Sequence, residues 1–511
     1  SFCGCPAVSF SCAKNSGLNQ LQIQEACERG VNFHVVADTL LEAMESPLLD
    51  GASPSAAAQY GTVLLPERHA LSTFQAGVAI FKAIVGPGLL FLPAGVKNAG
   101  LISSVLMSSA TGALATWCLL LVLDTTHALR SHGYTVKCIS DIGLAIYGLY
   151  GQLIVDICVV ISQLGFCIAY CVFVAENIQA IIFEQVGGMV SMGQMQSSCK
   201  LYGFLGSEQL VYYIILILFP LLIPVTWLRQ LKYFAMSNAI ASFLVIASVA
   251  FMLVILIKRY LEGGVGQNLS MFNWHGTLIY VGTAMYAFEG VAVLLPVEEK
   301  MASPEKMPQV VCWTLLLITA LQISFASIAY MNYGAATQSI VTISLGQGQI
   351  SGGTASVILV QLAWVIEVLL TFPLQLFPAV RILERVCSFR ERNSGQKWTK
   401  NLIRAATVVL CMMISLFGYT SVDNLVSMIG ALGCVPLAIT YPALFHYIVV
   451  RDFPPCDQEG SQQSDSCKSK ASTSDLVIVV LGILGTVTAT VTAAISWITT
   501  DFRFQTCVLR A

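Results

Sequence analysis

The chain has 511 residues, of which 56% are hydrophobic and only 11% are charged. A soluble domain carries roughly 25% charged residues, so this composition excludes an ordinary soluble protein and predicts an all-α polytopic membrane protein in a lipid bilayer. The net charge of −2 says nothing about nucleic acid, but no basic stripe and no zinc-finger spacing occurs, so we expect no nucleic acid partner.

Residues 1–70 are predicted to form a cytoplasmic, largely disordered N-terminal tail, with a pattern over 21–44 that allows an amphipathic helix. No signal-peptide pattern occurs in this tail, so we expect the first apolar span to act as the insertion signal. Cys3, Cys5 and Cys12 lack the second ligand pair of a structural zinc site. We therefore expect no metal and no cofactor.

Apolar runs of about 20 residues, the length that crosses a bilayer, predict about eleven transmembrane helices. The runs lie at 73–94, 101–123, 151–175, 209–228, 236–257, 276–297, 309–332, 354–379, 402–418, 423–448 and 475–499. The predicted organisation is a ten-helix core over 71–450, a disordered cytoplasmic loop over 451–474, and an eleventh helix with a short C-terminus over 475–511.

The distribution of Lys and Arg between the loops predicts the orientation of the chain. Most of these residues fall in loops that are cytoplasmic if the N-terminus is cytoplasmic, as the positive-inside rule requires. Lys258 and Arg259 are the exception. Asn268, in the only Asn-x-Ser/Thr sequon of the chain, falls in an outer loop and is a candidate for glycosylation.

The first span is interrupted at mid-depth by Gly86-Pro87-Gly88. A proline inside a helix costs about 3 kcal/mol or more, and each glycine adds roughly 1 kcal/mol. The freed backbone groups need protein, water or a ligand as partners in a bilayer. The interruption is therefore either a proline kink closed by neighbouring helices or a ligand site.

The sixth span contains a matching interruption at Phe288-Glu289-Gly290, followed by Pro296. Paired interruptions in corresponding spans of two five-span halves indicate a binding site at the midplane of an inverted-repeat transporter. The sequence thus predicts a 5+5 inverted repeat with broken helices 1 and 6, and favours the ligand site over the kink.

The two ends of a broken helix carry opposite partial charges. Free amides at 88–90 would hold a carboxylate, and free carbonyls at 83–85 would hold an ammonium group or a cation, which together match an amino acid. Tyr286 and Phe288 are candidates for the wall around the ligand's side chain. The predicted substrate-binding residues are Ile84, Val85, Gly86, Pro87, Gly88, Leu89, Tyr286, Phe288, Glu289 and Gly290.

Ionisable side chains inside spans are functional candidates because they are costly in a bilayer. Lys82 lies about one turn before the first break, and Asp156 and Glu367 are both candidates for its partner. Glu289 either caps the orphan amides of the outgoing half-helix or exchanges a proton during transport.

With these motifs in hand, the chain resembles the amino acid/auxin permease family, especially its proton-coupled and vacuolar amino acid transporters. The matching segments are Lys82, Gly86, 88–90, 92–93 and 97–100 in the first span, "GTAMYAFEG" (282–290) and "LLPVEEKM" (294–301) with Pro304 in the sixth, and "TFPLQLFP" (371–378) in the eighth. The resemblance implies the amino acid–polyamine–cation (APC/LeuT-like) fold and coupled movement of amino acids.

Two residues depart from the family pattern. Pro87 stands where relatives usually have a small or hydroxyl residue, and it removes one amide donor from the expected carboxylate site. Ala79 stands where several proton-coupled members have a histidine. Coupling through Glu289, or through a cation bound by the first-span carbonyls and Thr371, remains open.

The sequence therefore predicts a secondary active transporter of small neutral amino acids, coupled to protons and working by alternating access. A sodium-coupled transporter and an amino acid sensor with the same site are the alternatives. No HExxH motif and no nucleophile elbow occurs, so we expect no catalytic residue and no enzyme. The membrane is predicted to be vacuolar, lysosomal or plasma membrane.

Overall fold

The computed structural model describes residues 71–190, 208–227, 234–346, 354–387, 394–452 and 464–508. The predicted tail over 1–70 and the segment 453–463 of the predicted loop lie outside these residues. The expectation of disorder in both segments stays a prediction.

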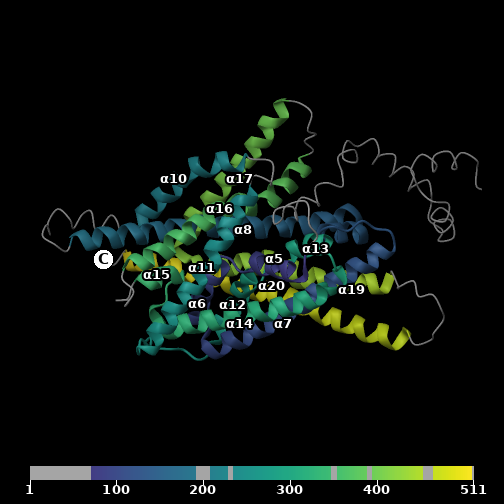
Figure 1. Cartoon of the computed structure of the whole chain (residues 1–511), viewed down its shortest axis with the longest axis horizontal. Helices are drawn as coiled ribbons and strands as arrows, with labels where there is room; N and C mark the ends of the chain where they lie inside the picture. Colours follow the sequence, from purple (N-terminus) through teal and green to yellow (C-terminus); the bar gives the residue numbers. More distant parts are fainter. Residues whose placement is uncertain are drawn as a thin grey trace, which may run out of the picture. The chain divides into compact units, whose positions relative to one another are not determined.

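Within the described residues the chain is helical, apart from one isolated bridge between Leu71 and Met301. The α-helices are α5 (Thr73–Ile84), α6 (Gly88–Ala99), α7 (Leu101–Ser131), α8 (Ile139–Val190), α10 (Glu208–Thr226), α11 (Phe234–Leu261), α12 (Trp274–Ala287), α13 (Val291–Lys300), α14 (Met307–Tyr333), α15 (Val341–Gly346), α16 (Thr354–Val386), α17 (Ser394–Gly418), α18 (Val422–Ile429), α19 (Tyr441–Asp452) and α20 (Ser464–Val508) (Figure 1). Short 3-10 turns η2 (Pro304–Lys306), η3 (Gly334–Ala336) and η4 (Tyr419–Ser421) and π-helical turns η5 (Gly430–Cys434) and η6 (Pro436–Thr440) connect several of them.

The all-helical membrane architecture is confirmed, whereas the number of spans stays a prediction. Nine helices among the described residues are long and apolar enough to cross a membrane, or up to ten if the bent pair α5–α6 counts as one span. One of the nine runs over 55 residues, Trp398–Asp452, and contains both the ninth and the tenth predicted spans. A continuous helix of that length would extend roughly 80 Å, far more than a bilayer core of about 30 Å.

Two helix boundaries differ from those expected. α8 begins at Ile139, well before the predicted start at 151, and Gly148 with φ 63° and ψ −151° divides it. A left-handed φ is accessible to glycine without strain, which allows the chain to turn here. α20 begins at Ser464, so the second half of the predicted loop over 451–474 is helical.

The core is a continuous set of buried apolar side chains in which aromatic rings link the helices. Phe91 of α6 meets Phe173 of α8 edge-on, with ring centroids 6.3 Å apart, and Phe173 meets Trp364 of α16 at 6.5 Å. Edge-to-face pairs of this kind stabilise a core beyond the area that they bury. The three rings connect the first, third and eighth predicted spans.

α6 and α12 lie directly against each other, as Figure 1 also shows. A methyl group on Gly95 of α6 would approach Cδ2 of Tyr280 to 2.7 Å, and one on Gly276 of α12 would overlap the carbonyl oxygen of Asn98. Small residues allow helices to approach this closely in membrane proteins. The second half of the first broken span and the first half of the sixth therefore form one tightly packed pair.

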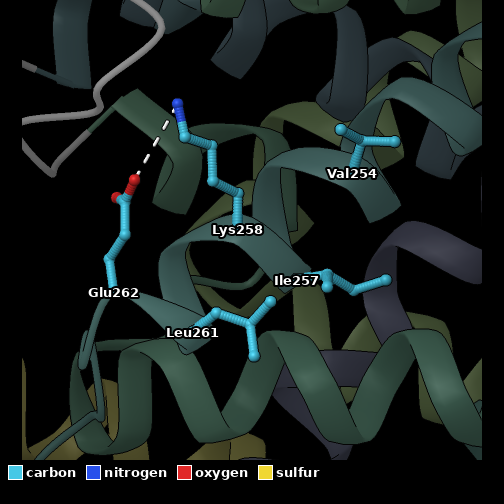
Figure 2. A pocket seen from close by; sticks show the side chains of 5 residues that line it. All are labelled: Val254, Ile257, Lys258, Leu261 and Glu262. Atoms are coloured by element: carbon cyan, nitrogen blue, oxygen red, sulfur yellow. Dashed lines mark ion pairs between the residues drawn. The ribbon is translucent and has the colours of Figure 1, made fainter.

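Lys258 and Arg259, which oppose the positive-inside pattern, both have local partners. Figure 2 shows Lys258 with Glu262 one turn further along α11, beside the apolar side chains of Val254, Ile257 and Leu261, and the Nζ–Oε1 distance is 3.8 Å. The guanidinium carbon of Arg259 lies 4.5 Å from the ring centroid of Tyr333 in α14. Both cations thus serve local contacts, which explains how they occur at this end of α11.

Candidate functional site

The first break lies between α5 and α6, whose axes differ in direction by 56°. Ser72 and Gln75 form a capping box that starts α5, with side chain-to-backbone hydrogen bonds of 3.0 and 3.2 Å. α5 ends where Val85 becomes extended, with φ −81° and ψ 97°. Pro87 then precedes the first residue of α6, a position that its fixed φ and missing amide allow.

The amides at this break differ from the expectation of three free donors. Leu89 donates to the carbonyl of Gly86 at 3.1 Å and Leu90 to that of Pro87 at 2.9 Å. Pro87 is itself in a helical conformation, which lets the first turn of α6 close on these carbonyls. Of the three amides expected to be free, only that of Gly88 has no backbone acceptor among the described residues. The expected carboxylate site is therefore smaller than the sequence predicted.

The second break separates α12 from α13. Phe288 ends α12 with a hydrogen bond to the carbonyl of Ala284, and α13 begins after Gly290 with no side-chain cap. Of the two roles that the sequence allowed for Glu289, capping of the outgoing half-helix has no supporting hydrogen bond among the described residues. Oε1 of Glu289 is buried and accepts no hydrogen bond from the described residues.

The two breaks lie against each other. A methyl group on Gly88 would stand 3.1 Å from Cα of Ala287 and 3.4 Å from the ring of Tyr286. A methyl group on Gly290 would stand 2.6 Å from Cγ1 of Ile84. Each break thus packs its glycine against the end of the opposite half-helix. The pairing of the two motifs, which sequence could only infer from their spacing, is a direct contact.

Gly86 differs from the other glycines of the breaks because it borders open space. No atom outside its immediate chain neighbours lies within 4 Å of the position that a Cβ atom would occupy there. Gly86 is also partly exposed, whereas Ile84, Val85 and Leu89 are buried in the core. The space at the first break is therefore bordered by backbone, as a site that recognises the backbone part of a ligand requires.

Tyr286 forms an aromatic cluster at the end of α12. Its ring centroid lies 4.6 Å from that of Phe166 in α8 and 6.1 Å from that of Phe91 in α6. Its hydroxyl group is buried and makes no hydrogen bond with the described residues. A buried tyrosine hydroxyl usually has a partner, so this group is available to a ligand. Phe288 is buried in the core beside this cluster.

Of the two candidate partners of Lys82 that the sequence left open, the structure favours Glu367 of α16. The side chains of Lys82 and Glu367 interact electrostatically. Thr371, one turn after Glu367, donates its hydroxyl to the carbonyl of Glu367 at 3.0 Å and lies 3.4 Å from Oε1 of its carboxylate. The other carboxylate oxygen, Oε2, is buried without a hydrogen-bond partner among the described residues. Three of the five charge candidates therefore gather near the first break.

Asp156, the other candidate partner of Lys82, is paired elsewhere. Its carboxylate accepts a hydrogen bond from the guanidinium group of Arg385, near the end of α16. Asp156 is buried, so the ion pair connects α8 to α16 within the protein. This contact indicates a packing role for Asp156.

The tenth predicted span lies beside the second break, and the sequence analysis did not identify it as part of the candidate site. Its residues form the π-helical turns η5 and η6, an arrangement often found at functional sites. Cys434 in η5 interacts electrostatically with both Glu289 and Tyr286. The cluster of Gly430, Gly433 and Pro436 in the sequence is the signal that could have indicated an irregular helix here.

A second group of contacts joins the ends of α5, α7 and α13. The chain just before α5 pairs with the chain after α13 through two backbone hydrogen bonds, from Leu71 to Lys300 (2.8 Å) and from Ala302 to Leu71 (2.9 Å). Glu298, which is 1% exposed, contacts His127 at 2.5 Å and Arg130 at 2.9 Å, both in α7. These contacts make the ends of the three helices one connected unit.

Residues 69–496 match the family model described as transmembrane amino acid transporter protein. The chain belongs to this family. The match covers the described helices from the first break to α20, and it confirms the resemblance drawn from the broken-span motifs. The family and the relatives described next are transporters and not enzymes, in agreement with the expectation from sequence.

Three relatives show the extent of the similarity. The chain is 31% identical to vacuolar amino acid transporter 4 of Saccharomyces cerevisiae over 413 residues, which cover 75% of this chain and 54% of the relative. It is 27% identical to vacuolar amino acid transporter 3 of Schizosaccharomyces pombe over 424 residues, covering 83% and 59%. It is 27% identical to amino acid transporter AVT3C of Arabidopsis thaliana over 428 residues, covering 82% and 89%. This family member thus spans somewhat over half the length of the two yeast relatives.

Among solved structures, this family member is similar to the inward-facing conformation of Mhp1, with 16% identity and a TM-score of 0.48 over 86% of this chain and 95% of that chain.

Proposed function

We propose that the chain is a secondary active transporter of small neutral amino acids, driven by protons and working by alternating access around the two breaks. The contact between the breaks carries this proposal: Gly88 packs against Ala287, Gly290 packs against Ile84, and open space remains at Gly86. Family membership and the printed names of the relatives support amino acids as the substrate class.

The chemistry at the breaks suits a small zwitterion. The amide of Gly88 at the start of α6 offers a donor and the positive end of a half-helix to a carboxylate. The carbonyl end of α5 offers a negative pole to an ammonium group. Tyr286, held between Phe91 and Phe166, would limit the length of the ligand's side chain.

We place the protein in a vacuolar or lysosomal membrane, since the yeast relatives are named vacuolar transporters. The N-terminus is proposed to be cytoplasmic, as the distribution of Lys and Arg predicts. Plasma membrane remains the alternative location, which localisation of a tagged full-length chain would identify.

The test is uptake of radiolabelled alanine into proteoliposomes with imposed pH or sodium gradients. A pH gradient should drive accumulation of alanine. Uptake that depends on the sodium gradient and not on the pH gradient would show that sodium is the coupled ion. Binding of alanine without flux would favour a sensor. Absence of both binding and flux would contradict the proposed function.

Gly86→Ala tests whether the open space is the substrate site. The added methyl group meets no atom within 4 Å, so we expect an unchanged folding yield and thermal midpoint. It would nevertheless occupy space next to the ligand backbone, and we expect the KM for alanine to rise at least about tenfold, a change of about 1.4 kcal/mol.

Gly88→Ala is the matched control for Gly86→Ala. Its methyl group would stand 3.1 Å from Cα of Ala287, so this variant should lower the thermal midpoint as well as transport. Wild-type transport by Gly86→Ala would show that the space at the first break is not occupied by substrate.

A further inference from the structure

We propose that Glu289 is the residue that carries the coupled proton. This inference rests on the proposed function, because it selects one group among the candidates for coupling. It stands on the position of Glu289 in the second break and on the absence, among the described residues, of a hydrogen bond or ion pair that would hold its carboxylate in the charged form.

Glu289 occupies the short segment between α12 and α13, next to Gly290, which packs against Ile84 of the first break. Its Oε1 is buried and has no hydrogen-bond donor among the described residues, and no described salt bridge includes it. The residue as a whole is partly exposed, although Oε1 itself is buried. Glu289 therefore lies in the second break without a permanent partner among the described residues.

Most other buried carboxylates of the described spans have cationic or hydrogen-bonding partners. Asp156 contacts Arg385, Glu384 contacts Arg404 at 2.8 Å, and Glu367 interacts with Lys82 and Thr371. A partner of this kind stabilises the charged carboxylate, and separating the pair is costly in a bilayer. These groups are consequently suited to holding helices together.

Glu176 in the second half of α8 is the closest competitor, since it too has no cation as a partner among the described residues. It interacts with a second carboxylate, that of Asp423 in α18. Glu176 lies one residue before Asn177, whose side chain accepts from Thr342 of α15 at 2.6 Å, and it belongs to neither break. This position makes Glu176 the appropriate control.

The groups that interact electrostatically with Glu289, either directly (Tyr170 and Cys434) or through one of these neighbours, come from five elements. Tyr170, which interacts electrostatically with Glu289, also interacts with Glu367 and Cys167. The titratable and charged side chains of this neighbourhood are Lys82 (α5), Cys167 and Tyr170 (α8), Tyr286 (α12), Glu367 (α16) and Cys434 (η5). Lys82 interacts with Glu367, so no cation of this group is assigned to Glu289.

The proposed step is a simple proton exchange. A hydronium ion on the acidic side transfers its proton to a carboxylate oxygen of Glu289, so that one O–H bond breaks and another forms and water is released. The free-energy cost of enclosing the substrate and the side chain in a low-dielectric interior is much lower for the neutral carboxyl group than for the carboxylate. Water on the other side accepts the proton from Glu289. The transporter, with the carboxylate charged again, then returns to its starting conformation.

Glu289→Gln in proteoliposomes tests this step because glutamine imitates the protonated state permanently. For one proton per alanine, a pH difference of one unit supports accumulation of at most about tenfold in the wild type. In Glu289→Gln we expect pH-driven accumulation to fall to about onefold, while exchange of external labelled alanine for internal unlabelled alanine stays measurable above the level of protein-free liposomes. Glu289→Asp should restore accumulation, and Glu176→Gln should keep it.

Five results would overturn the assignment. Undiminished pH-driven accumulation by Glu289→Gln would show that another group carries the proton. Loss of exchange together with accumulation, in a variant with an unchanged thermal midpoint, would instead assign Glu289 to substrate binding. Loss of accumulation in Glu176→Gln alone would transfer the role to Glu176. Wild-type uptake driven by sodium alone would exclude the proton as the coupled ion but agree with amino acid transport. A wild-type protein without any uptake or exchange would contradict the proposed function itself.

Discussion

Lys82 shows how a charge inside a span selects between two carboxylates that the sequence leaves open as candidates. Its ammonium group, about one turn before the first break, interacts with Glu367, whose carboxylate is also contacted by Thr371. Asp156 is held instead by Arg385. The pairs are thus separate, and each connects α16 to a different helix, α5 in one case and α8 in the other.

Lys82→Met and Glu367→Gln should be strongly non-additive in their effects on the free energy of unfolding. Each single variant leaves the other buried group unpaired, while the double variant leaves no unpaired charge. We expect a coupling energy of about 1 kcal/mol or more, measured as a double-mutant cycle by thermal unfolding in detergent. Lys82→Met combined with Asp156→Asn provides the control and should be additive within about 0.5 kcal/mol. Coupling to Asp156 in place of Glu367 would refute the pairing.

Close helix packing around the second break depends on glycines in two elements. A methyl group on Gly430 of η5 would overlap the carbonyl oxygen of Gly282 in α12, and one on Gly282 would overlap the carbonyl oxygen of Ser427 in α18. The hydroxyl of Ser427 donates to the carbonyl of Ile279 at 2.6 Å. The tenth predicted span therefore approaches α12 to backbone contact, which fixes the wall beside Glu289.

Gly430→Ala should destabilise the protein because its methyl group meets rigid backbone. We expect a loss of about 1–3 kcal/mol, seen as a lower thermal midpoint in detergent. Gly485→Ala in α20 is the matched control, since its methyl group would stand 4.0 Å from Cγ1 of Val435, an ordinary contact. Alanine is favoured over glycine in a helix, so this control should be neutral or stabilising by up to about 1 kcal/mol. An equal midpoint for both variants would contradict the close approach.

At the scale of the whole molecule, the first and the last described segments of the chain both contact helices of the core. Leu71, at the start of the described residues, pairs with the chain after α13. At the other end, His446 contacts the buried Asp475, with an Nδ1–Oδ2 distance of 2.7 Å, which joins α19 to α20, and α20 also packs against α12. The eleventh predicted helix is therefore part of the packed protein.

Asn268 provides a test of the orientation of the whole chain. It is exposed in the loop between α11 and α12, with φ 56°, and the following Ser270 donates its backbone amide to the hydroxyl of Tyr330 at 2.8 Å. If this loop is outside the cytoplasm, expression in a eukaryotic cell should give a glycosidase-sensitive gel shift that Asn268→Gln abolishes. Labelling of an introduced cysteine at Asn268 from the cytoplasmic side only would reverse the orientation.

The positions of the spans and of both breaks could be predicted from the sequence alone. In a bilayer the backbone must satisfy its own hydrogen bonds, so spans appear as long apolar runs, and interruptions such as Gly86-Pro87-Gly88 stand out within them. The same local rule placed Glu289 in the second break. The number of spans and the inverted repeat remain predictions.

What only the tertiary structure decided are the partners of groups that are far apart in sequence. Whether Lys82 pairs with Glu367 or Asp156, and whether Glu289 caps α13, depends on how helices pack around the breaks, which no local pattern encodes. Even the amides of Leu89 and Leu90, expected to be free, close on the preceding turn because of the conformation of Pro87. Composition and periodicity follow from the solvent that each residue meets, whereas pairing follows from three-dimensional contact.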